Sequence, residues 1–274
     1  MVLDAVAVSA RLWSTQAADC LEGTSAKPKN WEGITVDLTG QRVVLMGGTS
    51  GIGLATADAV SAQGAQAVVV SSRQSSVDKA LSELPQEAEG HVVNLADTEQ
   101  IADLFASLGD FDHLVYTAGE PLALMPLETL DIEAARSFFT LRFFSALDAV
   151  RAAAPRLRAG GSVTLTTGIA KDRPGPGWAV AAGICGAVEA LTKALAVELA
   201  PVRVNAVSPG VIRSPLWSGM SKGDRDAMYE NIGKSLPIGR VGEVEDVAQA
   251  YLYLITQPYT TGTIITIDGG TVLV

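Results

Sequence analysis

The sequence predicts an α/β protein built on a doubly wound parallel sheet of about seven strands, with helices on both faces. Two patterns predict this fold. Runs of apolar β-branched residues such as Val68-Val69-Val70 are continuous rather than alternating, which is typical of strands buried on both faces. These runs alternate with segments of helical periodicity, and strands joined through helices form parallel sheets with right-handed crossovers.

The elements follow one another from residue 41 onward. We expect strands at 42–46, 67–71, 91–94, 113–116, 162–166, 202–206 and 263–267. We expect helices near 51–63, 97–107, 129–154, 180–199 and 245–255. Residues 1–37 differ from the rest, because 5–18 have the pattern of a short amphipathic helix and 24–30 the composition of a linker. We therefore predict an N-terminal extension over 1–37 and one domain, including the substrate pocket, over 38–274.

Composition excludes several classes of function. The chain has 274 residues, of which 48% are hydrophobic, enough for one large core. Its net charge of -10 would repel nucleic acid and anionic lipid, so neither is an expected partner. Two cysteines and two histidines support neither a disulfide framework nor a metal site. No secretory leader or membrane-spanning run stands out, and we expect a soluble cytoplasmic protein.

A glycine-rich segment, Gly47 to Gly53, lies between an apolar run at 43–46 and a helical pattern. Isolated glycine motifs are often ordinary loops. Here a strand, a glycine turn and a helix follow in order, so the helix N-terminus presents free N–H groups and a positive dipole to a pyrophosphate. This arrangement predicts a dinucleotide site.

Residues 40–270 resemble the short-chain dehydrogenase/reductase family, which has a Rossmann fold. The glycine loop matches the family motif with Met46 in the threonine position, and Tyr116-Thr117-Ala118-Gly119 stands where the family has Asn-Asn-Ala-Gly. The segments Asn205–Gly210 and Ile267–Gly270 match the family after its last two strands. Several ordered motifs at family spacing carry this resemblance.

The resemblance implies a set of cofactor contacts. These are Gly47, Thr49, Ser50, Gly51, Ile52, Ser72, Arg73, Asn94, Leu95, Ala118, Gly119, Pro209, Gly210, Ile212 and Ser214. Family members that prefer NAD have an acid in the position of Ser72, where it accepts hydrogen bonds from the ribose. A serine followed by Arg73 suits the 2′-phosphate of NADP(H) instead, although Arg73 is also compatible with an ordinary solvated side chain.

The four residues with which the family reduces carbonyls are absent. Arg142 occupies the asparagine position, Gly168 the serine position, Ala181 the tyrosine position and Cys185 the lysine position. A shifted alignment does not restore them, because no tyrosine occurs between Tyr116 and Tyr229. Cys185 has no base near it in sequence, and we expect an inert thiol there.

Three charged residues are candidates for chemistry. Arg142 either binds an anionic or carbonyl group or forms a structural ion pair with Glu120 or Asp172, and the sequence leaves both open. Glu120 and Asp172 are acid/base candidates, although solvated loop carboxylates are common. The expected substrate pocket contains Thr167, Gly168, Trp178 and Trp217, and the two tryptophans either stack on a flat substrate or fill core space.

Two functions fit these residues. The first is an NADP(H)-dependent reductase of an imine or iminium, or of a carbonyl with help from Arg142, in small-molecule or secondary metabolism. Some family members with arginine in the asparagine position are iminium reductases that also guide a cyclisation. The second is a non-redox cyclase or isomerase, or an NADP(H)-binding pseudoenzyme that acts as a sensor. The resemblance also implies a homo-oligomer, a tetramer or a dimer.

Overall fold

The computed structural model describes residues 37–274, which form one unit of the chain. The helix and linker expected within 1–37 therefore lie outside the described residues. Seven parallel strands form one sheet in the order β3-β2-β1-β4-β5-β6-β7. They are β1 Arg42–Met46, β2 Gln66–Ser71, β3 Glu89–Val92, β4 Phe111–Tyr116, β5 Leu157–Thr166, β6 Arg203–Pro209 and β7 Ile264–Ile267. This sheet confirms the predicted doubly wound α/β fold.

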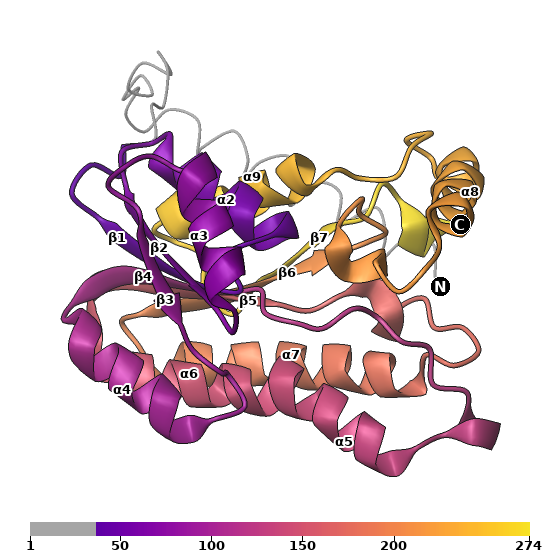
Figure 1. Cartoon of the computed structure of the whole chain (residues 1–274), viewed down its shortest axis with the longest axis horizontal. Coiled ribbons are helices and arrows are strands. Elements are labelled where there is room, and N and C mark those ends of the chain that lie inside the picture. Colours follow the sequence, from indigo (N-terminus) through magenta and orange to yellow (C-terminus); the bar gives the residue numbers. More distant parts are fainter. Residues whose placement is uncertain (1–36) are drawn as a thin grey trace, which may run out of the picture. The chain divides into compact units, whose positions relative to one another are not determined.

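Helices cover both faces of the sheet, as Figure 1 shows: α2, α3 and α9 lie on one face, and α4, α5, α6 and α7 on the other. A further helix, α8, lies at the right of that view, apart from both layers. The bounds are α2 Gly51–Ser61, α3 Gln74–Glu83, α4 Thr98–Leu108, α5 Ile132–Phe139, α6 Ser145–Ala153, α7 Ala179–Glu198, α8 Lys222–Ser235 and α9 Val244–Thr256.

The main hydrophobic core lies between the sheet and the helices α4, α6 and α7. Strand residues such as Val44 and Leu114 are fully buried there, and Val44 pairs with Leu114 in the ladder between β1 and β4. Burial on this scale explains why the central strands have no polar alternation, because each contacts helices on both faces. The sheet thereby provides a rigid base for the loops at its carboxyl ends.

The helices differ from the sequence prediction in three respects. The helix expected at 129–154 is interrupted by a π-helical turn, Thr140–Phe144, between α5 and α6. Helices α3 and α8 were not predicted, because their sequences are polar and carry few apolar positions. The helix α7 is long and apolar enough to cross a membrane by length and composition, contrary to the expectation that no run stands out. It packs on the sheet through residues such as Ile184 and Val188.

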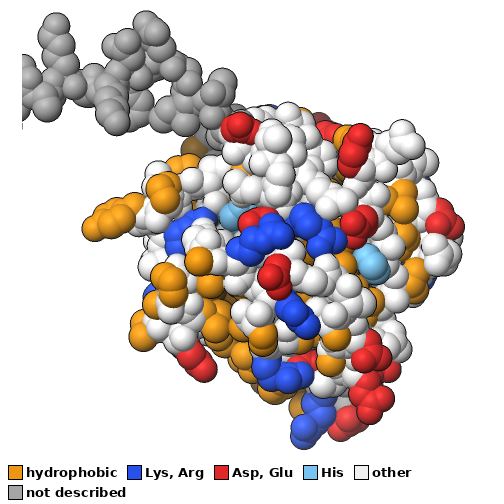
Figure 2. All heavy atoms as spheres, turned by 90° about the vertical axis from the view of Figure 1, so that its left-hand side faces the viewer, with side chains coloured by type: hydrophobic (Ala, Val, Ile, Leu, Met, Phe, Trp, Pro, Cys, Tyr) orange, Lys and Arg blue, Asp and Glu red, His pale blue; other side chains and the backbone are white. Residues whose placement is uncertain are grey.

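Ion pairs link neighbouring elements at the surface. Arg42 contacts Glu89 at 2.8 Å, and Arg158 contacts Asp112 at 2.9 Å. Figure 2 shows basic and acidic side chains lying next to one another on one face of the molecule. On this face the charges therefore form local pairs rather than a patch of one sign.

A histidine is buried inside the sheet. The His113 ring on β4 lies 2.8 Å from Ser162 Oγ through Nδ1 and 2.7 Å from Gln41 Oε1 through Nε2. Because the Gln41 amide oxygen accepts, Nε2 carries the proton and Nδ1 accepts from the Ser162 hydroxyl. Burial and the charge of Arg203 lower the pKa of His113 to about 4, against the opposite influence of Asp112. His113 is therefore neutral at pH 7.

Candidate active site

A cavity of about 1010 Å³ opens at the carboxyl ends of the strands. Its walls come from the loops that follow β1 to β6, which is where open α/β sheets bind ligands. The structure brings to this cavity all fifteen cofactor positions predicted from the sequence, from Gly47 to Ser214. The four predicted substrate-pocket residues, Thr167, Gly168, Trp178 and Trp217, also line it.

The glycine loop forms a cradle that side chains would fill. Gly47 has a φ of +90°, and a Cβ atom added there would lie 2.6 Å from the Ala118 nitrogen. A Cβ atom at Gly53 would lie 2.3 Å from the Gly47 carbonyl oxygen. The side chain of Ser50 does not cap α2, so the first N–H groups of this helix remain available to a ligand. These features fit the pyrophosphate of a dinucleotide.

The end of the cavity next to β2, where the sequence predicts the adenosine of the cofactor, carries a basic rather than an acidic residue. Ser72 and Arg73 are exposed where β2 ends, and Arg73 is the residue that precedes α3. The first turn of α3 contains no acid. A 2′-phosphate at this position would meet a guanidinium group and no carboxylate of α3, which fits NADP(H).

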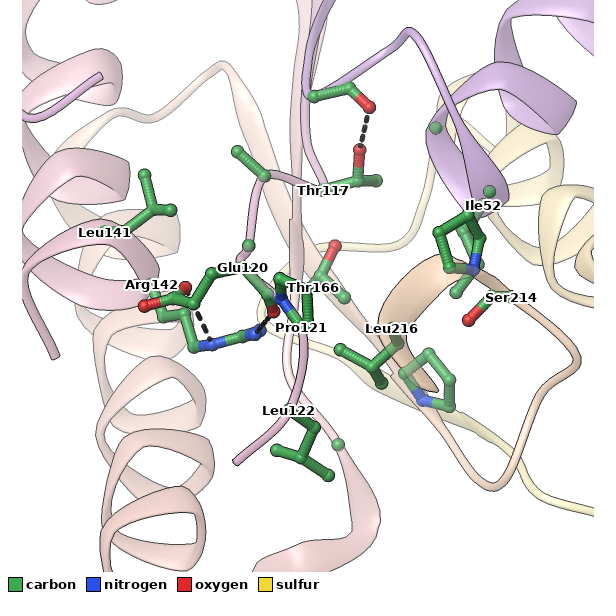
Figure 3. A pocket seen from close by; sticks show the side chains of 18 of the residues that line it. Ile52, Thr117, Glu120, Pro121, Leu122, Leu141, Arg142, Thr166, Ser214 and Leu216 are labelled. Atoms are coloured by element: carbon green, nitrogen blue, oxygen red, sulfur yellow. Dashed lines mark hydrogen bonds and ion pairs between the residues drawn. The ribbon is translucent and has the colours of Figure 1, made fainter. Parts of the chain in front are cut away.

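Arg142 and Glu120 both line the cavity and face one another, as Figure 3 shows. Arg142 Nη2 donates a hydrogen bond to the Glu120 carbonyl oxygen, and Arg142 Nε lies 3.4 Å from Glu120 Oε2. The guanidinium carbon lies 4.3 Å from the centre of the Phe138 ring. A Cβ atom at Gly119 would lie 2.5 Å from Arg142 Nη1, so only a glycine at this position leaves enough space for the guanidinium.

Burial governs the protonation of this pair. It raises the pKa of Glu120, while the Glu120 backbone and the charge of Arg142 lower it less. Burial also lowers the pKa of Arg142, but an arginine starts so high that it stays protonated at neutral pH. Arg142 is thus an ion-pair partner of Glu120, one of the two interpretations left open by the sequence, and it also lines the cavity.

Asp172 does not belong to this arrangement. It is absent from the cavity wall, and its carboxylate accepts a hydrogen bond from Lys171. Lys171 Nζ also lies 3.0 Å from Glu189 Oε1 on α7. The structure therefore places Asp172 in an ion-pair cluster with Lys171 rather than with Arg142.

The positions of the family's catalytic residues hold no efficient proton donor. Gly168, Ala181 and Cys185 all line the cavity. Burial raises the pKa of the Cys185 thiol. A Cβ atom at Gly168 would lie 3.3 Å from Cys185 Sγ, so the thiol takes part of the space that a serine side chain would need.

Apolar side chains form the rest of the substrate end. They include Leu122, Phe138, Leu141, Trp178, Leu216 and Trp217. The Trp217 indole Nε1 donates to the Ile212 carbonyl at 3.0 Å, which fixes the orientation of its ring. Sequence patterns did not single out Phe138 and Leu141, because their helical spacing also suits ordinary core residues. Tyr116 was missed as well, although its place in the asparagine position of the family motif was a signal.

Comparison with known proteins identifies the class of protein. Residues 35–274 match the model of the SDR-like Rossmann domain, and the chain belongs to the short-chain dehydrogenase/reductase family. It is 34% identical over 254 residues to the short-chain dehydrogenase/reductase fsr5 of Gibberella fujikuroi, a match that covers 86% of this chain and 96% of that protein.

Two solved structures are also similar. The MalC reductase/Diels-Alderase from Malbranchea aurantiaca is 31% identical, with a TM-score of 0.80 over 86% of this chain and 97% of that chain. A small-chain dehydrogenase in complex with NADPH is 35% identical, with a TM-score of 0.75 over 85% of this chain and 99% of that chain.

Proposed function

We propose that this protein is an NADPH-dependent reductase of imines or iminium ions in secondary metabolism. One observation carries the proposal: the dinucleotide cradle is complete, while Ala181 replaces the tyrosine that donates a proton in the family and Cys185 replaces the lysine that eases its loss. A site that keeps its cofactor and loses its acid suits a substrate that needs no acid.

The two substrate classes differ in the charge that develops during reduction. Bound NADPH supplies a hydride ion. When a ketone is the acceptor, negative charge grows on oxygen, and the site must provide a proton or a strong oxyanion donor. When an iminium carbon is the acceptor, an existing positive charge disappears and no proton is transferred in that step. The side chains of this cavity favour the second case.

Glu120 and Arg142 have different roles in this proposal. The Glu120 carboxylate, when ionised, attracts a cationic substrate at the substrate end of the cavity. Arg142 lowers the pKa of that carboxyl group and holds its backbone carbonyl. The Arg142 side chain also lines the cavity, and a guanidinium there suits the anchoring of a substrate carbonyl. The rings of Trp178 and Trp217 add apolar contact for a flat heterocycle.

Preference for NADPH over NADH is part of the proposal. It is supported by Ser72 and Arg73 at the adenosine end and by the related small-chain dehydrogenase that is solved with NADPH. Direct reduction of a carbonyl, with Arg142 as the oxyanion donor, is a variant within the same class.

A second candidate function is a cyclisation or isomerisation in the same cavity, with or without hydride transfer. The similar protein MalC is described as a reductase/Diels-Alderase, which supports this candidate. A further non-redox alternative is a pseudoenzyme that binds NADPH and catalyses no reaction. The apolar walls and the absence of the family's tyrosine and lysine suit the cyclase and the pseudoenzyme alike.

An imine panel distinguishes the candidates. Purified full-length protein is mixed with NADPH and a series of cyclic imines, and absorbance at the reduced nicotinamide band is followed together with product by mass spectrometry. Stoichiometric oxidation of NADPH supports the reductase. Tight binding of NADPH without turnover favours the pseudoenzyme, and a cyclised product without NADPH oxidation favours the cyclase.

A homo-oligomer, tetramer or dimer, also remains a proposal. Val197 on α7 is 81% exposed and Phe144, beside α6, is 56% exposed. Large apolar side chains on the outside of neighbouring helices suit burial against a second copy of the chain.

A further inference from the structure

The helix that carries Arg142 is irregular at that residue. In the π-helical turn Thr140–Phe144, the Ser145 N–H bonds to the Thr140 carbonyl, five residues back. In an α-helix this N–H would bond to Leu141, four residues back. In the π turn the Leu141 carbonyl therefore does not receive the hydrogen bond that the Ser145 N–H would donate in an α-helix. Because this carbonyl is half-buried, it needs a different hydrogen-bond donor.

Tyr116 supplies that donor from a different element. Its hydroxyl, at the end of β4, donates to the Leu141 carbonyl oxygen at 2.6 Å. The tyrosine is only 2% exposed, so water does not easily replace it. Its ring belongs to the core beneath the cavity, which ties the π turn to the rigid sheet.

The residue next to this hydrogen bond is Arg142. Its guanidinium fits a narrow place with the Phe138 ring on one side, the Gly119 backbone close by and Glu120 at its end. A return of the Ser145 N–H to Leu141 would tighten the turn and rotate the side chains that it carries. The position of Arg142 thus depends on the turn remaining open.

We propose that Tyr116 is the positioning residue for Arg142: its hydroxyl occupies the Leu141 carbonyl that the π turn frees, and so holds the guanidinium against Gly119 and Glu120. This inference rests on the proposed use of Arg142 and Glu120 in the site. This role explains why Tyr116 stands at the first asparagine position of the family's Asn-Asn-Ala-Gly motif. The tyrosine acts through the helix and is not the acid of the reaction.

Tyr116→Phe tests the proposal, because it removes only the hydroxyl. With a cyclic iminium substrate and NADPH, we expect kcat to fall about tenfold. In the background of Arg142→Ala, the same change should have little further effect, because the residue that it positions is gone. An equal loss in both backgrounds would overturn the proposal, as would unchanged kcat in Tyr116→Phe.

A readout without turnover separates this inference from the proposed reaction. The Glu120 carboxyl carbon is followed by ¹³C NMR across a pH titration and assigned by its loss in Glu120→Gln. Groups that face this site are Arg142, Tyr116 and the Cys185 thiol. Tyr116→Phe should raise the pKa of Glu120, because the guanidinium moves away. If the Glu120 titration curve is unchanged in Tyr116→Phe, the inference is contradicted, even if the protein reduces iminium ions. If the curve is shifted, the inference is supported, even if the protein reduces no iminium ion.

Tyr251→Phe is the matched control. The Tyr251 hydroxyl is also buried and lies 2.6 Å from Thr166 Oγ1, which bonds to the Tyr116 backbone carbonyl and not to the Tyr116 hydroxyl. We expect both variants to lose a similar amount of thermal stability, while only Tyr116→Phe shifts the Glu120 titration. A similar shift in both variants would show that general loosening of the fold, rather than positioning, is responsible.

Discussion

Replacing Arg142 with alanine should impair turnover of an iminium substrate far more than replacing Cys185. The guanidinium side chain is 21% exposed, donates to the Glu120 carbonyl and lies against the Glu120 carboxylate. A hydrogen bond to a charged group contributes about 1.5–3 kcal/mol, and the low exposure leaves little of this to solvent screening.

The size of the effect follows from this contact. If the substrate depends on the geometry that Arg142 maintains, a loss of about 2 kcal/mol in transition-state stabilisation lowers kcat/KM roughly 30-fold. Steady-state NADPH oxidation with a cyclic iminium measures it directly. Arg142→Ala should also raise the pKa of Glu120, because the neighbouring positive charge that lowers it is lost.

Two further variants define what would refute this reasoning. Cys185→Ala removes a buried thiol with a raised pKa, and we expect kcat/KM to change less than twofold. Gly119→Ala keeps the charge of Arg142 but places a Cβ atom 2.5 Å from its Nη1, so activity should fall as the guanidinium is displaced. Full activity in Arg142→Ala, or a greater loss in Cys185→Ala, would remove Arg142 from the assigned role.

Three other expectations concern cofactor choice, pH and assembly. Arg73→Ala should weaken NADPH binding about tenfold and leave NADH binding nearly unchanged in fluorescence titrations, and equal effects on both would contradict the 2′-phosphate assignment. In the folded protein the pKa of His113 is lowered to about 4, whereas a histidine in the unfolded chain has a pKa near 6.5. As the pH falls, the unfolded chain therefore binds a proton before the folded protein does. Stability should therefore be full above about pH 6.5 and decline by up to about 3 kcal/mol as the pH falls toward 4, and His113→Gln should remove that slope in denaturant melts. Sedimentation should give a mass above one subunit, and the double variant Phe144→Ser/Val197→Ser should lower it, whereas a monomeric wild type would contradict the assembly.

The sheet could be predicted from the sequence because its strands are long apolar runs between clear helical segments. Every expected strand is present, and the glycine loop lies where the motif placed it. The helices α3 and α8 were missed because neither has a strong apolar stripe, and only α8 has a side-chain cap, at Ser221. The sequence signal for such helices is weak.

The substrate end was harder to predict. That Arg142 pairs with Glu120 rather than Asp172 depends on the direction of a loop and of a π turn, and spacing along the chain reports neither. The hydrogen bond of Tyr116 joins residues on different elements and has no local pattern. The residues of the site are therefore easier to predict from the sequence than the contacts they make.

Transfer of a deuteride to matched substrates tests the central claim most directly. The full-length protein is given NADPH that carries deuterium at the reactive carbon, together with a cyclic iminium ion or the ketone of the same ring skeleton. Mass spectrometry then measures the label in each product. We predict one deuterium in the amine formed from the iminium ion and at least 100-fold slower labelling from the ketone, the factor expected of a missing general acid. Equal labelling of both substrates, or labelling of the ketone alone, would contradict the account.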